Sequence, residues 1–307
     1  MRHPESSRLF ASALALLLAP LVVLGATACV PASSTMPTPE AKGPVTVATM
    51  IDSEGAILGN MLLILLEKNG FATEDKTSFG TPDILRKALE AGEVDLVVDY
   101  TGSGQYYGAV AEDSVWSDPD KGYEATRDYD KETNNLWWLE PAPANNTEML
   151  AVLRTFAEAN SLVTMEDFAA YVNAGKTVKL ICAAGFAENP KGLLGYQEAY
   201  GFTLRADQLI ILSHGNTAEM LKALSEGTDG VNVSLVYGTD GSLDKMDMVV
   251  LDDPKNVPPV YRPAPVLRGE LADQYPELET LFAPVFRTLT RETLQQLNAR
   301  VAFDGEE

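Results

Sequence analysis

The chain has 307 residues, of which 46% are hydrophobic, and a formal net charge of −21. So large an acidic excess excludes proteins that bind nucleic acid or anionic lipid through a basic surface. The length is sufficient for two ordinary domains with well-buried cores.

The chain begins with a segment typical of a secretory leader. Arg2 and Arg8 precede an uncharged run from Leu9 to Ala28, which ends in small residues just before Cys29. A charged start, an apolar centre and small residues at the end predict a signal peptide over residues 1–28. The cysteine that follows directly is then the predicted lipidation site of a lipoprotein.

A second interpretation of this segment stays open. The uncharged run is close to the roughly 20 residues that span a bilayer, so an uncleaved membrane anchor also fits. Both interpretations place the rest of the chain outside the cytoplasm, in the periplasm or at the cell surface.

A tether and a lone cysteine follow the leader. Residues 29–43 are rich in Pro, Ala, Ser and Thr, a composition that predicts a flexible linker. Lipidation of Cys29 would leave Cys182 as the only other cysteine, which excludes an intramolecular disulfide. Stability must therefore come from buried cores.

Alternating strands and helices begin after the tether. Residues 45–49 have the pattern of a strand, and apolar spacing predicts a helix over residues 54–69. Thr81 is the expected N-cap of a second helix that starts at Pro82 and stops at Gly92. A buried strand is expected over residues 94–98.

The alternation continues to the end of the chain. Residues 116–135 lack an apolar period and are interpreted as a surface excursion. Further strands are expected at 178–183, 209–212, 231–236 and 249–251, and helices at 165–173, 217–225, 272–281 and 291–301. A Pro-rich extended stretch is expected over residues 258–266. Such alternation predicts an α/β protein with parallel sheets.

Enzymatic activity has little support in the sequence. The two histidines are His3, in the leader, and His214, and the sequence has no HExxH, no GxSxG and no complete GxxxxGK[ST] phosphate loop. Cys182 lies on an expected buried strand, where a core role is favoured over a nucleophile. We therefore predict a protein that is not an enzyme and needs no cofactor and no metal.

Two loops are candidates for ligand binding. Residues 99–104 and 237–241 each follow an expected strand, which is where open α/β sheets place ligands. Their Thr, Asp and Gly residues are also typical of plain turns. Tyr100, Tyr237 and Tyr261 together suggest a ring of aromatic side chains, which can bind a cation that has no N–H to donate.

Six further segments carry a combined pattern: IDSEGA (51–56), DYTG (99–102), WLEPAPANNT (138–147), GVNV (230–233), VYGTDG (236–241) and VYRPAP (260–265). With these segments the chain resembles the osmoprotectant-binding proteins of glycine betaine, carnitine and choline ABC importers, and within that family the stress-induced Yeh-type branch. The resemblance runs from Val45 to the C-terminus.

The resemblance implies a type II-like periplasmic-binding-protein fold. Each of its two lobes is a sheet flanked by helices, with the ligand cleft between the lobes and hinge closure on the ligand. Lobe I would comprise residues 44–142 plus 251–307, and lobe II residues 143–250. The partners implied are a small cationic or zwitterionic osmolyte, an ABC permease and, through it, a cytoplasmic ATPase.

The family's ligand site implies roles for individual residues. The cationic head would lie among Tyr100, Tyr237 and Tyr261, in contact with the backbone near Asn146. Ser103 aligns with a hydroxyl residue that helps to hold the ligand carboxylate.

Three positions depart from the family pattern. Glu148 replaces an aromatic residue, Met50 a lysine that neutralises the ligand carboxylate, and Asn189, less securely aligned, an arginine. Each also has an ordinary alternative role: Glu148 facing solvent, Met50 packing in the core and Asn189 capping a turn. If these three residues act in the ligand site, the site has less positive and more negative charge than the family pattern. Such a site favours choline over glycine betaine.

Two other functions remain open. The chain could be a ligand-sensing or catalytic lipoprotein with the same two-lobed fold, or a binding protein specific for glycine betaine.

Overall fold

The structure is a computed structural model that describes residues 42–213 and 217–306. The expected signal peptide, the lipidation site Cys29 and most of the expected tether lie outside the described residues, as does His214. In the part of the chain that is described, no helix combines the length and apolar character needed to cross a membrane.

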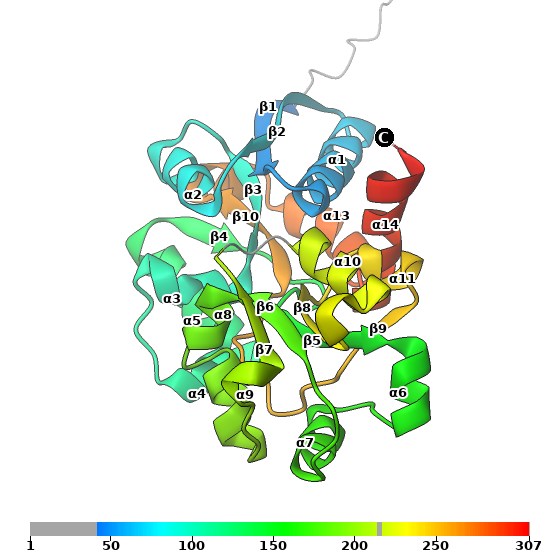
Figure 1. The fold of residues 1–307 in the computed structure, drawn as a ribbon. Coiled ribbons are helices and arrows are strands. Elements are labelled where there is room, and N and C mark those ends of the chain that lie inside the picture. The colour runs from blue at the N-terminus through cyan, green and yellow to red at the C-terminus, as the bar shows by residue number, and fades with distance from the viewer. Residues whose placement is uncertain (1–41, 214–216, 307) are drawn as a thin grey trace, which may run out of the picture. The chain divides into compact units, whose positions relative to one another are not determined.

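The first lobe is built on a five-stranded sheet with strand order β2-β1-β3-β10-β4 (Figure 1). Its strands are β1 (Lys42–Met50), β2 (Phe71–Gly80), β3 (Leu96–Tyr100), β4 (Leu136–Trp138) and β10 (Pro263–Arg268). Strands β1, β2 and β3 run parallel, whereas β10 pairs antiparallel with both β3 and β4. The expectation of purely parallel sheets is therefore wrong, because the chain returns to this sheet from the second lobe in the opposite direction.

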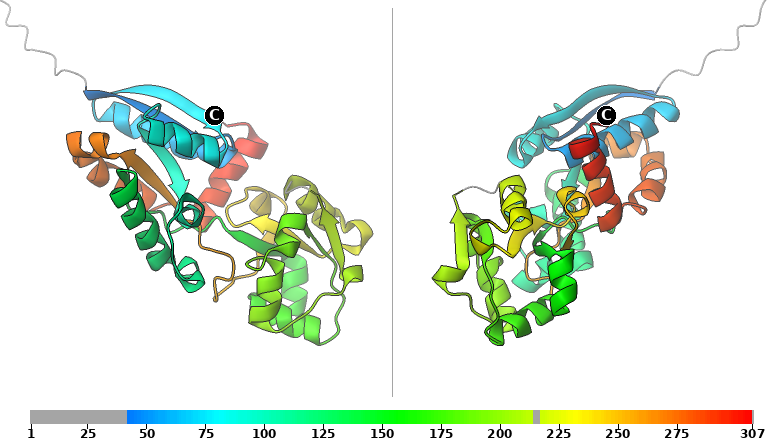
Figure 2. Two further views of the ribbon diagram at one scale, coloured as in Figure 1. Left: turned by 90° about the vertical axis from the view of Figure 1, so that its left-hand side faces the viewer. Right: turned by 45° about the vertical axis from the view of Figure 1, so that its right-hand side comes forward.

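Helices cover this first sheet. They are α1 (Ser53–Lys68), α2 (Pro82–Ala91), α3 (Gly104–Tyr107), α4 (Asp113–Trp116), α5 (Pro119–Thr133), α12 (Gly269–Gln274), α13 (Glu277–Phe286) and α14 (Arg291–Asp304), with a short 3-10 turn at Thr101–Ser103. Helix α1 buries Leu58, Leu62 and Leu66 in a core shared with Phe282 of α13. Figure 2 shows the C-terminal helix α14 in red beside α1, against which it packs.

The second lobe repeats the same design. Its sheet has the order β7-β6-β8-β5-β9, and β5 runs antiparallel to its neighbours β8 and β9. The strands are β5 (Glu148–Leu153), β6 (Leu180–Ala183), β7 (Leu209–Leu212), β8 (Val233–Tyr237) and β9 (Met248–Val250). The helices are α6 (Arg154–Asn160), α7 (Met165–Asn173), α8 (Ala184–Glu188), α9 (Leu193–Tyr200), α10 (Thr217–Glu226) and α11 (Ser242–Lys245).

Cys182 lies inside this second core. It is fully buried on β6, and burial raises the pKa of its thiol to about 11. A thiol that stays protonated is a poor nucleophile, which agrees with the predicted core role.

Two expectations about the elements are wrong, and some elements, among them strand β2, were not expected. The expected surface excursion contains α5, a helix of 15 residues. Strand β2 was not expected, because it lies at the edge of the sheet and carries the polar run from Thr73 to Lys76. The helix expected over residues 272–281 is two helices that are separated at Tyr275 and Pro276.

Helix α5 is held to the lobe by polar contacts, which explains why an apolar period is missing. Its buried positions are Gly122, Thr126 and Asp130. Asp130 accepts hydrogen bonds from both terminal nitrogens of Arg86 and, at 2.6 Å, from the indole nitrogen of Trp138. A buried carboxylate needs such partners, since an unpaired buried charge is strongly destabilising.

Candidate functional site

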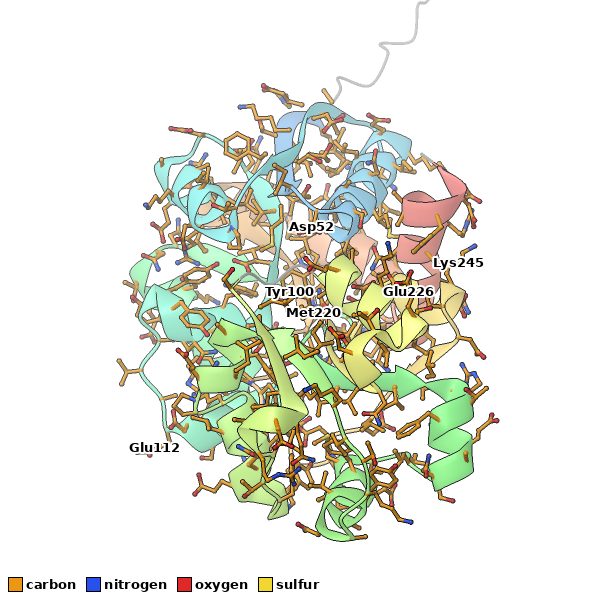
Figure 3. The ribbon with its side chains drawn as sticks, viewed as in Figure 1. Asp52, Tyr100, Glu112, Met220, Glu226 and Lys245 are labelled. Atoms are coloured by element: carbon orange, nitrogen blue, oxygen red, sulfur yellow. The ribbon has the colours of Figure 1, made fainter. Side chains whose placement is uncertain are left out.

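A cavity of about 1310 Å³ lies between the lobes. Residues at the carboxyl ends of β1, β3, β6 and β8 line it, together with the segments that cross between the lobes. All eight residues singled out in the sequence lie on its wall: Met50, Tyr100, Ser103, Asn146, Glu148, Asn189, Tyr237 and Tyr261. In Figure 3, Asp52 and Tyr100 lie among packed side chains near the centre of the view, whereas Glu112 projects at its edge.

Tyr100 is held in place by a buried carboxylate. It ends β3, and its hydroxyl donates a 2.6 Å hydrogen bond to Oε1 of Glu54 in the first turn of α1. Glu54 is 5% exposed. Burial raises the pKa of its carboxyl group, while hydrogen bonds from Thr239, Tyr100 and Asn298 act in the opposite direction. The first tyrosine of the ring is therefore fixed at both its backbone and its hydroxyl.

The neighbouring Asp99 stabilises the loop that follows β3. It is buried, accepts a hydrogen bond of 2.8 Å from the hydroxyl of Tyr107, and has its pKa raised by burial to about 6. Asp99 does not line the cavity, so its role is to shape the loop that carries Ser103.

Tyr261 lies against this loop because residue 102 is a glycine. A Cβ at Gly102 would come within 2.8 Å of the Tyr261 ring and of the carbonyl oxygen of Val260. The Tyr261 amide donates to Oδ1 of Asn145 at 2.9 Å, and its hydroxyl accepts from Nε2 of Gln105 at 3.2 Å. The glycine of the Asp-Tyr-Thr-Gly motif thus permits a close ring contact, which a plain turn would not require.

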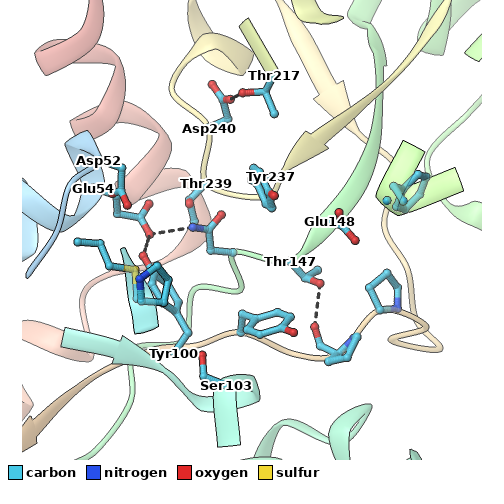
Figure 4. Close-up of a pocket in the computed structure, with 18 of the residues that line it drawn as sticks. Asp52, Glu54, Tyr100, Ser103, Thr147, Glu148, Thr217, Tyr237, Thr239 and Asp240 are labelled. Atoms are coloured by element: carbon cyan, nitrogen blue, oxygen red, sulfur yellow. Dashed lines mark hydrogen bonds between the residues drawn. The ribbon is translucent and has the colours of Figure 1, made fainter. Parts of the chain in front are cut away.

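The second lobe contributes Tyr237 and Glu148 as a cross-strand pair. They are directly opposite each other in the β5–β8 ladder, so their side chains are on the same face of the sheet. Tyr237 is 43% exposed, and burial raises the pKa of Glu148. Gly238 permits the close approach of the crossing segment, because a Cβ there would lie 2.4 Å from the carbonyl oxygen of Asn145. Figure 4 shows Tyr237 between Glu148 on one side and Glu54 on the other.

The remaining predicted residues combine two roles. Met50 ends β1, is 8% exposed and belongs to the core as well as to the cavity wall. Asn189 accepts a hydrogen bond from the amide of Lys191 at 2.9 Å, so it caps a turn while lining the cavity. The Asn146 side chain donates to Glu54 at 3.2 Å.

Acidic residues outnumber basic residues in the cavity wall. Among the lining residues that the structure describes, six are acidic and one, Lys191, is basic. The acidic residues are Asp52, Glu54, Asp83, Asp113, Glu148 and Asp240. Lys191 forms an ion pair with Asp113 at 2.9 Å, so none of the described lining residues offers an unpaired cation to a ligand carboxylate.

Several lining residues were missed in the sequence. Glu54 lies in one of the recognised segments, but nothing local shows that it is buried in the cleft. Asn298, on α14, donates to Oε2 of Glu54 at 2.7 Å across 244 residues of sequence. An asparagine within a terminal helix gives no signal of such a contact.

Comparison with known proteins identifies relatives along most of the chain. The model of a family described as the substrate-binding domain of ABC-type glycine betaine transport systems matches residues 43–307. The glycine betaine-binding protein YehZ of Escherichia coli K12 is 42% identical over 266 residues, which are 87% of each chain.

Solved structures agree with this result. The structure of apo YehZ from Escherichia coli matches with a TM-score of 0.80 over 86% of this chain and 94% of that one. A crystal structure described as a glycine betaine/carnitine/choline ABC transporter matches with a TM-score of 0.75 at 26% identity, over 86% of this chain and 94% of that one. The predicted resemblance and the two-lobed fold are confirmed.

Proposed function

Because the chain belongs to the family of substrate-binding domains of ABC-type glycine betaine transport systems, we propose that its cleft captures a quaternary ammonium cation without a carboxylate, such as choline. Membership of this family confirms the prediction that the protein is a substrate-binding protein of an osmoprotectant importer and not an enzyme. The proposal concerns which ligand of this family the cleft prefers.

The charge of the cavity wall is the observation that supports this ligand class. A zwitterion brings a carboxylate, and burying it without a cationic partner costs several kcal/mol. The described wall offers six acidic residues and a lysine that is already paired. Met50 and Asn189 add no positive charge where the family pattern has a lysine and an arginine.

The three tyrosines are proposed to hold the ammonium head. Tyr100, Tyr237 and Tyr261 all line the cavity, and their π faces attract a cation while tolerating its methyl groups. Glu148, paired with Tyr237 across β5 and β8, adds a negative charge beside them. Direct attraction in a partly desolvated cleft would favour a net cation over a zwitterion.

Glycine betaine is the second candidate. It is supported by the similarity to YehZ, a glycine betaine-binding protein that is 42% identical to this chain. In that case Ser103 and the amide groups of the wall would have to hold the carboxylate.

We also propose that the protein is anchored to a membrane, outside the cytoplasm. Cys29 would anchor the chain to a membrane through lipid, outside the cytoplasm, after removal of residues 1–28. The tether of residues 29–43 would let the two lobes, residues 44–142 plus 251–307 and residues 143–250, reach an ABC permease that works with a cytoplasmic ATPase.

Substituting Glu148 by Gln tests the charge argument. We expect Glu148→Gln to weaken choline binding by roughly tenfold, equivalent to about 1.4 kcal/mol, and to change glycine betaine binding much less, because a zwitterion has no net charge. Isothermal titration of each ligand gives both dissociation constants. Glu188→Gln is the matched control, since Glu188 is exposed and does not line the cavity. Equal losses for the two ligands would contradict the proposed role of Glu148.

A further inference from the structure

The carboxylate of Glu54 lies where several segments of the chain meet. Its Oε1 accepts from the hydroxyl of Tyr100 on β3 at 2.6 Å and from Nδ2 of Asn146, just before β5, at 3.2 Å. Its Oε2 accepts from Nδ2 of Asn298 on α14 at 2.7 Å. The side chain of Thr239, in the loop after β8, also forms a hydrogen bond with Glu54. Partners from both lobes therefore fix the position of this carboxylate.

The geometry of these contacts favours the ionised form of Glu54. Asn298 also donates to the carbonyl oxygen of Thr239 at 2.9 Å, and because that oxygen can only accept, the Asn298 side chain presents its N–H groups on this side. The Tyr100 contact lies within the roughly 2.5–2.7 Å typical of a hydroxyl that donates to an ionised carboxylate. Glu54 is also in the first turn of α1, where the helix dipole stabilises negative charge. Burial opposes ionisation and raises the pKa, so the charge depends on these partners.

The neighbours of Glu54 leave its negative charge uncancelled. Its hydrogen-bond partners are neutral side chains, and Asp52, the N-cap of the same helix, adds a second negative charge nearby. Glu54 is 5% exposed, and a buried charge is screened by salt much less than an exposed one. An electric field from Glu54 therefore acts on whatever occupies this part of the cleft.

Tyr100 connects this charge to the proposed cage. Its hydroxyl donates to Glu54, and the residue lines the cavity. A hydrogen bond to a carboxylate polarises the tyrosine and makes the face of its ring more negative, which strengthens its attraction for a cation. Glu54 and Glu148 lie on opposite sides of Tyr237 (Figure 4). A cation held among the tyrosines would therefore have a carboxylate on each side.

We propose that Glu54 is a specificity-determining residue, whose buried carboxylate favours a cationic ligand through Tyr100 without touching it. No contact is required, because electrostatic attraction in a desolvated cleft extends over several ångströms. This inference rests on the proposed function, since it assumes that the ammonium head binds among the tyrosines.

Choline and 3,3-dimethyl-1-butanol are matched probes for this role, since a carbon atom replaces the nitrogen and removes the charge while the shape is kept. Isothermal titration of choline and competition by the alcohol give the ratio of their affinities, which measures the preference for charge. Glu54→Gln should reduce this ratio by about fivefold to tenfold, because the field of the carboxylate is lost. Glu54→Asp keeps the charge and should bind choline more tightly than Glu54→Gln. Glu67→Gln is the control and should leave the ratio unchanged, because Glu67 is an exposed residue of the same helix that does not line the cavity.

The outcomes separate an electrostatic role from a structural one. Equal losses for choline and the alcohol in Glu54→Gln would overturn the proposal, because they would show that Glu54 serves packing alone. Equal choline affinity in Glu54→Asp and Glu54→Gln would also overturn it, and this comparison decides if the alcohol does not compete measurably. If Glu54→Gln does not fold, Tyr100→Phe takes its place, and an unchanged ratio there would contradict the proposal. If the unmodified protein does not bind choline, the proposed function itself fails.

Discussion

Tyr237→Ala and Tyr261→Ala should each weaken choline binding by about tenfold or more. A desolvated cation–π contact contributes roughly 0.5–2 kcal/mol, and about 1.4 kcal/mol corresponds to a factor of ten. Tyr261 packs against Gly102 and Tyr237 lies opposite Glu148, so each ring has a defined place in the wall. Isothermal titration of the two variants against choline measures the loss.

Phenylalanine substitutions separate the rings from their hydroxyls. Tyr237→Phe and Tyr261→Phe keep the π face and should bind within a few-fold of the unmodified protein. Tyr100→Phe should weaken choline binding more than these two substitutions do. The Tyr100 hydroxyl donates to the buried Glu54, so its loss removes a hydrogen-bond partner of that carboxylate. Unchanged choline affinity in both alanine variants would show that the ammonium head lies elsewhere.

Met50→Lys should reverse the ligand preference. Met50 ends β1 in the cavity wall, and a lysine there would bring a cation to the position that the resemblance aligns with a family lysine. Pairing an otherwise unpaired buried carboxylate is worth several kcal/mol, so the ratio of the two affinities should shift toward glycine betaine by tenfold or more. Separate titrations of choline and glycine betaine give this ratio.

Met50→Leu is the control for this substitution. Leucine keeps the apolar volume without adding charge, so the ratio should stay close to that of the unmodified protein. An unchanged ratio in Met50→Lys would mean that residue 50 does not face the ligand and serves only the core.

Local sequence signals predicted much of the fold. Helix α7 has the expected bounds Met165–Asn173, because Thr164 and Asp167 form a capping box at its start. Gly92 ends α2 as expected, in the left-handed conformation with φ of 75°. Such signals act within a few residues, so they are visible without tertiary structure.

The missed elements depend on contacts that are distant in sequence. Helix α5 buries Thr126 and Asp130 against polar partners, which gives no apolar period. Strand β2 is held by its backbone pairing with β1 at the edge of the sheet, while its side chains are largely polar. Neither pattern can be recognised before the partner is known.

The site also has some residues that sequence motifs predict and others that depend on contacts distant in sequence. Tyr100, Tyr237 and Tyr261 follow motifs that the resemblance supplied, and all three line the cavity. Glu54 and Asn298 meet only because α1 and α14 pack together, so their contact was not predictable from local sequence. The hydrogen bonds that Glu54 receives from Tyr100 and Asn298 are likewise visible only in the structure.

A direct competition tests the central claim that the cleft prefers a cation without a carboxylate. The purified protein is equilibrated with choline and glycine betaine in equal concentrations, and native mass spectrometry identifies the bound ligand. We expect choline to predominate, because the described wall is acidic and its one lysine is paired. Predominance of glycine betaine would contradict the account.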